Sequence, residues 1–217
     1  MLYLVSTPIG NLEDITFRAV RILKEADYIA CEDTRTSGVL LKHYDIHTSL
    51  LSFHSHSGVT KVDKIIELLK EWKNIALISD AGTPGISDPG YILIRAAIEA
   101  SIEVSPIPGA SAVLSAIVSS GMQMNHFLYL GFLPIKKGRQ TLFTSLKNKD
   151  YSVVMYESVH RIMKTLEELE KYFGPEHHIC VGREITKKFE EFKRGPVSEV
   201  RAYFEKATCK GEFVIIF

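Results

Sequence analysis

The chain has 217 residues, of which 46% are hydrophobic and 24% charged, and its 26 basic and 26 acidic side chains cancel. This composition supplies a sizeable apolar core and argues against both intrinsic disorder and a strongly basic nucleic-acid module. The cysteines Cys31, Cys180 and Cys209 form no CxxC pair, so we expect neither a zinc site nor a disulfide framework. No apolar run reaches the length of a membrane span, and we expect a protein of the reducing cytoplasm.

The first half of the sequence alternates short apolar strands with helices. Its expected strands are 2–6, 28–31, 50–53, 74–78 and 102–105. Its expected helices are 17–26, 39–43, one that begins at Thr60, 91–100, and one that stops at Gly121. Strands that alternate with helices at this spacing predict a mostly parallel sheet with helices on both faces.

The pattern changes near residues 121–126. The second half has expected strands at 127–133, 151–156, 179–183, 188–193 and 212–217, and expected helices at 141–146, 161–173 and 197–206. This less regular alternation favours a mixed sheet. We therefore predict an α/β protein of two αβα domains, 1–120 with a mostly parallel sheet and 121–217 with a mixed sheet.

Unusual loops follow several of the expected strands. They lie at 7–12, 32–35, 54–58, 79–90, 106–111, 157–161 and 183–187. The loop at 79–90, SDAGTPGISDPG, is long for a strand-to-helix connection, and its glycines and prolines let a ligand approach the backbone closely. In an open α/β sheet ligands bind at the carboxyl ends of strands, so this loop is predicted to hold a ligand.

Several catalytic motifs are missing from the sequence. There is no GxGxxG after the first strand, no P-loop and no GxSxG, and the histidine spacings do not match a metal site, so no metal is expected. The acid–base candidates are Glu32, Asp33, Glu157, His160 and Glu184. The alternative for each is a helix cap or an ion pair with a nearby arginine, and a single such residue is more often structural than catalytic.

The charges are divided unevenly along the chain. Residues 1–110 carry 10 basic and 14 acidic side chains, whereas residues 111–217 carry 16 and 12. Lys136, Lys137 and Arg139 form the densest basic stretch. It fits a solvated surface and a phosphate-backbone contact equally well.

An ordered series of motifs resembles one family. It comprises STPIGNL at 6–12, CEDTR at 31–35, the 79–90 loop, PIPGASA at 106–112, GFLP at 131–134, YES at 156–158, REITK at 183–187 and KGEF at 210–213. Together these motifs resemble the bacterial small-subunit ribosomal RNA 2′-O-methyltransferase I family, of the tetrapyrrole-methylase-like class. The resemblance covers essentially the whole chain, and the 79–90 loop is its most specific part.

The resemblance implies two αβα domains with S-adenosylmethionine bound between them, and a homodimer. It implies that the substrate is the ribose 2′-hydroxyl of a cytidine in the decoding region of 16S ribosomal RNA, within the 30S subunit. By motif matching, the cofactor-binding residues would be Pro8, Ser79, Asp80, Ala81, Gly82, Ser111, Ala112, Glu157, Glu184, Gly211 and Phe213. Much of this contact would come from the backbone.

For catalysis we expect Asp33 or Glu184 as the general base, with Arg35 and Lys187 orienting a phosphate or the hydroxyl. Glu32, Lys136, Lys137 and Arg139 are expected to bind the substrate. Many family members extend past the KGEF strand, whereas this sequence ends at Phe217, so the basic second half would supply the RNA contacts. Two alternatives remain: a methylase of the same class acting on a tetrapyrrole-like small molecule or a protein residue, and a non-catalytic module for a nucleotide-like ligand.

Overall fold

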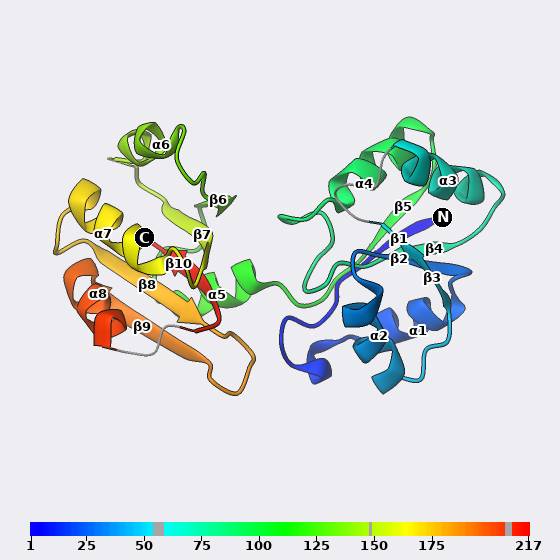
Figure 1. The fold of residues 1–217 in the computed structure, drawn as a ribbon, viewed down its shortest axis with the longest axis horizontal. Helices are drawn as coiled ribbons and strands as arrows, with labels where there is room; N and C mark the ends of the chain where they lie inside the picture. The colour runs from blue at the N-terminus through cyan, green and yellow to red at the C-terminus, as the bar shows by residue number, and fades with distance from the viewer. Residues whose placement is uncertain (54–58, 148, 207–209) are drawn as a thin grey trace. The chain divides into compact units, whose positions relative to one another are not determined.

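The computed structural model describes residues 1–53, 59–147, 149–206 and 210–217 (Figure 1). The predicted loop at 54–58 and Cys209 lie outside these residues. The chain divides into two compact units, Met1–Ser111 and Ala112–Phe217. Helix α5 (Ala112–Ser120) packs against the strands of the second unit, so the division falls one helix before the expected boundary at residue 120.

The first unit is an α/β sheet built from strands that all pair in parallel. Its strands are β1 (Leu2–Val5), β2 (Tyr28–Cys31), β3 (Ser49–Ser52), β4 (Ile75–Leu77) and β5 (Val104–Ile107), in the order β3-β2-β4-β1-β5. Its helices are α1 (Phe17–Glu25), α2 (Thr34–His43), α3 (Val59–Lys70) and α4 (Gly90–Glu99), with a short 3₁₀ turn η1 (Leu12–Asp14). The predicted parallel sheet is confirmed.

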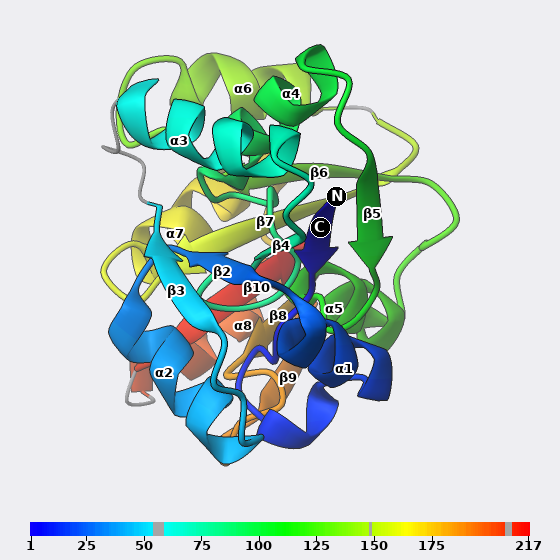
Figure 2. The ribbon, with the colours of Figure 1, turned by 90° about the vertical axis from the view of Figure 1, so that its right-hand side faces the viewer.

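The strand order explains why helices cover both faces of this sheet. The chain moves from β1 to β2 and β3 toward one edge, then from β3 to β4 and β5 toward the other. Because parallel crossovers are right-handed, this reversal sends α1 and α2 to one face and α3 and α4 to the other. Figure 2 shows the two helix pairs on opposite sides of the strands. Accordingly Ala76 and Ile78 pack with α1 and α2, whereas Ile75 and Leu77 pack with α3 and α4.

Side-chain caps decide where the first two helices begin. Thr16 Oγ1 accepts a hydrogen bond from the Ala19 N–H (3.1 Å), and the Asp33 carboxylate accepts one from the Arg35 N–H (2.8 Å). Each bond satisfies a donor that a helix start leaves unpaired. The Asp33 cap starts α2 at Thr34, five residues earlier than the apolar pattern predicted.

The second unit contains a mixed sheet, as predicted. Its strands are β6 (Phe127–Phe132), β7 (Ser152–Ser158), β8 (His178–Arg183), β9 (Glu191–Pro196) and β10 (Glu212–Ile216), in the order β6-β7-β10-β8-β9. Only the β6–β7 pair is parallel among these neighbours. The helices after α5 are α6 (Arg139–Ser145), α7 (Ile162–Phe173) and α8 (Val197–Lys206). Strand β9 begins three residues later than expected, because residues 187–190 form a turn in which the Glu190 N–H donates to the Lys187 carbonyl (3.0 Å).

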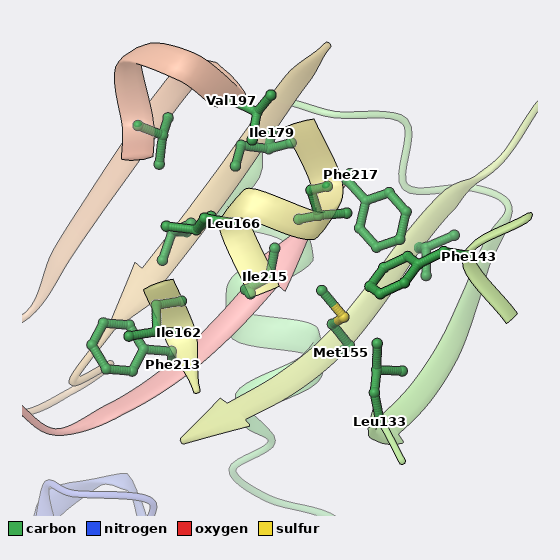
Figure 3. Close-up of a cluster of buried hydrophobic side chains, with 14 of the residues drawn as sticks. Leu133, Phe143, Met155, Ile162, Leu166, Ile179, Val197, Phe213, Ile215 and Phe217 are labelled. Carbon is green, nitrogen blue, oxygen red and sulfur yellow. The ribbon is translucent and has the colours of Figure 1, made fainter. Parts of the chain in front are cut away.

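The core of the second unit forms around the apolar face of α7. Ile162, Leu166 and Leu169 recur at helical spacing and are fully buried. Figure 3 shows the first two among side chains from β7, β8, β10, α6 and α8, which include the buried Phe143 and Phe213. In the described residues, no helix combines the length and apolar character needed to cross a membrane.

Candidate functional site

The first unit has a topological switch point between β1 and β4. These strands are neighbours, yet the chain leaves β1 toward α1 on one face and leaves β4 toward α4 on the other. The loops that follow them therefore separate at the carboxyl edge of the sheet, where open α/β sheets bind ligands. The predicted ligand loop, 79–90, is one of these two loops, and the loop after β1 contains Pro8.

A short antiparallel bridge joins the two loops. The Thr7 N–H donates to the Gly82 carbonyl (2.9 Å), and the Gly82 N–H donates back to the Thr7 carbonyl (3.1 Å). Gly82 has a φ of +79°, and a Cβ there would lie 3.3 Å from Ile9 Cγ2. Glycine fits because it carries no Cβ and adopts positive φ freely. The bridge fixes the backbone at 79–82 relative to Pro8.

Hydroxyl groups extend this bridge to the loop after β5. Ser6 Oγ and Thr83 Oγ1 share a hydrogen bond of 2.9 Å, and Thr83 Oγ1 donates to the Ala110 carbonyl (3.3 Å). A Cβ on Gly109 would lie only 2.9 Å from the Ser6 Cβ, so the two backbones meet closely. Ser6, Thr83 and Gly109 were not among the predicted site residues, although the glycine that follows Pro108 is a signal in the sequence for such a close approach.

The rest of the 79–90 loop is organised by Asp88. Its carboxylate accepts hydrogen bonds from the Gly85 N–H (2.9 Å) and the Gly90 N–H (2.7 Å). Ser79 and Gly82 are buried at the base of the loop, whereas Asp80 and Ala81 are exposed above it. A buried base under an exposed tip leaves Asp80 and Ala81 accessible to a ligand, while the Ala81 carbonyl accepts a hydrogen bond from Ser79 Oγ (3.2 Å).

Asp80 connects this loop to the end of β2. Its Oδ1 accepts a hydrogen bond from the Asp33 N–H (3.1 Å), so two of the predicted site residues do lie together. Asp33 in turn holds Arg35 through both carboxylate oxygens, at 3.1 and 2.7 Å. These hydrogen bonds from the Arg35 side chain, followed by the Arg35 N–H, lower the pKa of Asp33 from 3.8 to about 2.

This lowered pKa predicts a pH dependence. Because the folded pKa lies below the unfolded one, the Asp33 contribution to folding stability is complete above about pH 4 and is lost as the pH falls through about 2. We expect carbon NMR of the Asp33 carboxyl to give a midpoint near pH 2, and Arg35→Ala to return it toward 3.8. An ordinary midpoint in the wild-type chain would contradict the pairing.

In the second unit, Glu184, Lys187, Glu212 and Gly211 form a cluster. Glu184 Oε1 accepts hydrogen bonds from Lys187 Nζ and from the Glu212 N–H, both at 3.0 Å, and Lys187 Nζ also lies 2.8 Å from Glu212 Oε2. A Cβ on Gly211 would overlap the Glu184 side chain, which explains the glycine of KGEF. Partial burial would raise the pKa of Glu184, but the bonds from Lys187 and Glu212 outweigh it and lower that pKa. Glu212 was missing from the sequence-based site.

Two of the predicted cofactor contacts, Glu157 and Phe213, have side chains buried in the interior of the second unit. Phe213 is 2% exposed and packs in the core, and the Glu157 side chain is fully buried between Arg139 and Arg161. The two residues face each other across β10 and β7. Neither side chain is free for a ligand in this arrangement, so a cofactor contact there would have to use the backbone.

The basic stretch at 136–139 separates into two environments. Lys136 and Lys137 are exposed, whereas the Arg139 side chain is 4% exposed. Arg139 was expected to bind substrate, but in this arrangement its guanidinium is not available at the surface, because it is held by Glu168 and Thr165. In the described parts of the chain, no three His, Cys, Asp or Glu side chains are grouped to hold a metal ion.

Comparisons with known proteins agree with this geometry. Residues 1–201 match the model of the Tetrapyrrole (Corrin/Porphyrin) Methylases. The chain is 49% identical over 216 residues to a Ribosomal RNA small subunit methyltransferase I from Halalkalibacterium halodurans, covering 99% of this chain and 74% of the relative. It is 47% identical over 217 residues to the protein of that name from Synechocystis sp., covering 100% and 78%.

The fold is also found among solved structures. A uroporphyrin-III C-methyltransferase from Thermus thermophilus, solved with S-adenosyl homocysteine, has a TM-score of 0.69 over 99% of this chain and 96% of its own. At 16% identity this likeness concerns the fold alone. The family model and the relatives cover nearly the whole chain. The chain therefore belongs to the ribosomal RNA small subunit methyltransferase I family, within the tetrapyrrole methylases.

Proposed function

We propose that this chain transfers a methyl group from S-adenosylmethionine to the ribose 2′-hydroxyl of a cytidine in the decoding region of 16S ribosomal RNA. Family membership makes it an S-adenosylmethionine-dependent methyltransferase of ribosomal RNA. The atom and nucleotide that accept the methyl group are the proposed part. The observation that carries the proposal is the 79–90 loop at the switch point, which the Thr7–Gly82 bridge holds in place. This loop occurs here in a chain that is 49% identical to a named member of the family.

The residues at the switch point suit the methionine part of the donor. That part is a zwitterion, so its ammonium group needs acceptors and its carboxylate needs N–H donors. The exposed backbone at Asp80 and Ala81 and the Asp80 carboxylate offer both kinds of group. We propose that Pro8, Ser79 and Gly82 shape the floor beneath them, and that Ser111, Ala112, Glu184 and Gly211 contribute mainly through the backbone.

The donor supplies a sulfonium-activated methyl group, so the chain's main task is to position the hydroxyl in line with it. Asp33 and Glu184 remain our candidates for receiving the hydroxyl proton, with Arg35 and Lys187 orienting a phosphate or the hydroxyl. Both carboxylates have lowered pKa values, which makes them weak bases at neutral pH. We therefore propose that the proton is transferred only as the new carbon–oxygen bond forms, when the hydroxyl has become acidic.

We also propose a cytoplasmic homodimer that acts on the 30S subunit. The support within the first unit is an apolar groove between the 79–90 loop and α4, lined by Pro84, Ile86, Tyr91, Ile94 and Ile98. Of these, Ile86, Tyr91 and Ile98 are 45%, 59% and 60% exposed. Arg95 and Glu99 border the groove. An isologous contact would place Arg95 of each copy near Glu99 of the other.

The test is methyl transfer with isotopically labelled S-adenosylmethionine, using enzyme whose mass in solution has first been measured by analytical ultracentrifugation. We expect a dimer that labels isolated 30S subunits and leaves a panel of tetrapyrroles and proteins unlabelled. Digestion of the RNA to nucleosides should then yield 2′-O-methylcytidine. Label in a base, or label in a panel compound only, would contradict the proposed acceptor.

A further inference from the structure

The second unit contains a buried cluster of charges that the proposed reaction does not use. Arg139 is 4% exposed, and Glu157 and Thr165 are 1% and 0% exposed. Arg139 Nε lies 2.7 Å from Glu168 Oε2, and its Nη2 donates to Thr165 Oγ1 (2.6 Å) and lies 3.7 Å from Glu157 Oε2. Taking charged groups out of water is costly unless they are paired and hydrogen-bonded, so the cluster calls for an explanation.

Glu157 is held from its other side by Arg161. Arg161 Nε lies 2.8 Å from Glu157 Oε1, and Thr165 Oγ1 donates to Glu157 Oε2 (2.6 Å). The Glu157 carboxylate is therefore fixed by groups from the start of α6 and the start of α7. Two planar guanidinium groups around one carboxylate make a rigid unit, because each arginine can direct several N–H groups at once.

Both arginines use a remaining N–H group to hold the same short stretch of backbone. Arg161 Nη1 donates to the Leu133 carbonyl (2.9 Å), and Arg139 Nη1 donates to the Pro134 carbonyl (3.1 Å). These consecutive carbonyls lie where the chain leaves β6. The cluster thus fixes the base of residues 134–138, which we call the basic loop.

The basic loop presents cations and apolar groups together. All of residues 134–138 are exposed, Ile135 by 69%, and Lys136 and Lys137 have no ion-pair partner among the described residues. Phe132, just before the loop, is 53% exposed and rests against the Tyr156 ring at a centroid distance of 5.5 Å. Cations that contact phosphates, next to apolar groups that contact bases, are the two elements of single-strand nucleic-acid binding.

We infer that the basic loop is a docking site for an RNA strand. In this inference Arg139 and Arg161 are positioning residues that hold the base of the loop in place before RNA binds. This inference rests on the proposed function, which supplies RNA as the acceptor. Lys136 and Lys137 contact backbone phosphates, while Phe132 and Ile135 contact a base or ribose. A loop already held at its base loses little conformational freedom when RNA binds, so the two lysines contribute more to affinity than they would on a free loop.

The first test measures how RNA binding depends on salt. The dissociation constant of a short labelled oligocytidylate is measured across a series of salt concentrations for the wild type, for the double variant Lys136→Ala/Lys137→Ala, and for Arg194→Met. With about 0.7 counterions released per phosphate on a single strand, losing both lysines should reduce the log–log salt slope by about 1.4. Arg194 is an exposed arginine that also donates to backbone carbonyls, those of Ser119 and Ser120, and its loss should leave the slope almost unchanged.

The second test separates positioning from folding by a double-mutant cycle. Arg161→Lys keeps a cation beside Glu157 but loses the planar fork that also reaches the Leu133 carbonyl. We expect this variant to bind RNA several-fold more weakly in the wild-type background and to have no further effect in the Lys136→Ala/Lys137→Ala background. A merely structural role would give the same loss in both backgrounds. Calorimetry with S-adenosylmethionine should show unchanged donor binding in every variant.

The outcomes separate the two proposals. If wild-type enzyme methylates 30S subunits while the lysine variants keep the wild-type salt slope, the docking inference is wrong and the proposed function stands. If the effects of Arg161→Lys and of the two lysine changes on RNA binding were additive, Arg161 would not be a positioning residue for the loop. If the wild-type chain neither binds the oligonucleotide nor labels 30S subunits, the proposed function and the docking site both fail.

Discussion

Gly82→Ala is expected to weaken S-adenosylmethionine binding by roughly tenfold or more, which corresponds to at least about 1.4 kcal/mol. An L-residue in the left-handed conformation costs about 1–2 kcal/mol, and the new Cβ would press on Ile9 at 3.3 Å. Relief of this strain moves the backbone that forms the Thr7–Gly82 bridge. Because the bridge sets the position of residues 79–82, the exposed backbone that receives the donor moves with it. Isothermal titration calorimetry with S-adenosylmethionine measures the effect.

The matched control is Gly121→Ala. Gly121 has nearly the same φ, +76°, but a Cβ there meets nothing within 4 Å and the residue lies outside the loop. The control carries the same backbone strain without the displaced bridge, so its donor affinity should equal that of the wild type. Equal affinity in Gly82→Ala itself would show that the bridge does not shape the donor site.

Glu157→Ala should strongly destabilise the second unit, with a loss of about 3–5 kcal/mol in the free energy of unfolding. Removing the carboxylate takes from Arg161 the ion-pair partner of its Nε, and leaves the buried Arg139 with Glu168 as its one remaining charged partner among the described residues. The only tryptophan, Trp72, lies in the first unit, so its fluorescence does not report this loss. Hydrogen exchange of the β7 and α7 amides in urea measures it directly.

Glu25→Ala supplies the contrast. Glu25 pairs with Arg21 at 2.7 Å, a separation like that of Glu157 from Arg161, but both side chains of the surface pair are 57% exposed. Exposed pairs on a helix contribute about 0.3–0.5 kcal/mol, so this change should barely alter exchange or unfolding. A comparable loss in both variants would mean that burial does not set the strength of the Glu157 cluster.

Much of the fold was predictable because it follows from local periodicity. Helix 197–206 was predicted with its observed bounds, and each expected strand has an observed counterpart. The errors arose where a single polar side chain or a tight turn decides the boundary. The Asp33 cap begins α2 before its apolar residues do, and the turn closed by the Glu190 N–H and the Lys187 carbonyl delays β9.

The candidate site was predictable to the extent that it depends on loops at strand ends. The sequence indicated the 79–90 loop and Asp33, and the hydrogen bond from the Asp33 N–H to Asp80 brings them together. It could not indicate that Arg139 is buried, because a run of basic residues ordinarily lies in solvent. The partners that reverse this expectation, Thr165 and Glu168, lie 26 and 29 residues further along and meet Arg139 only in the folded unit.

The strand orders also bear on when each unit can fold during synthesis. In the first sheet β1 lies between β4 and β5, and in the second β10 lies between β7 and β8. Strand β1 therefore lacks its neighbour β5 until residue 107 is available, and the second sheet lacks a central strand until residue 216 has been added. Such distant pairings fold slowly and leave strand edges uncovered in the meantime. For each unit, the period of greatest exposure to aggregation should therefore last for most of its translation.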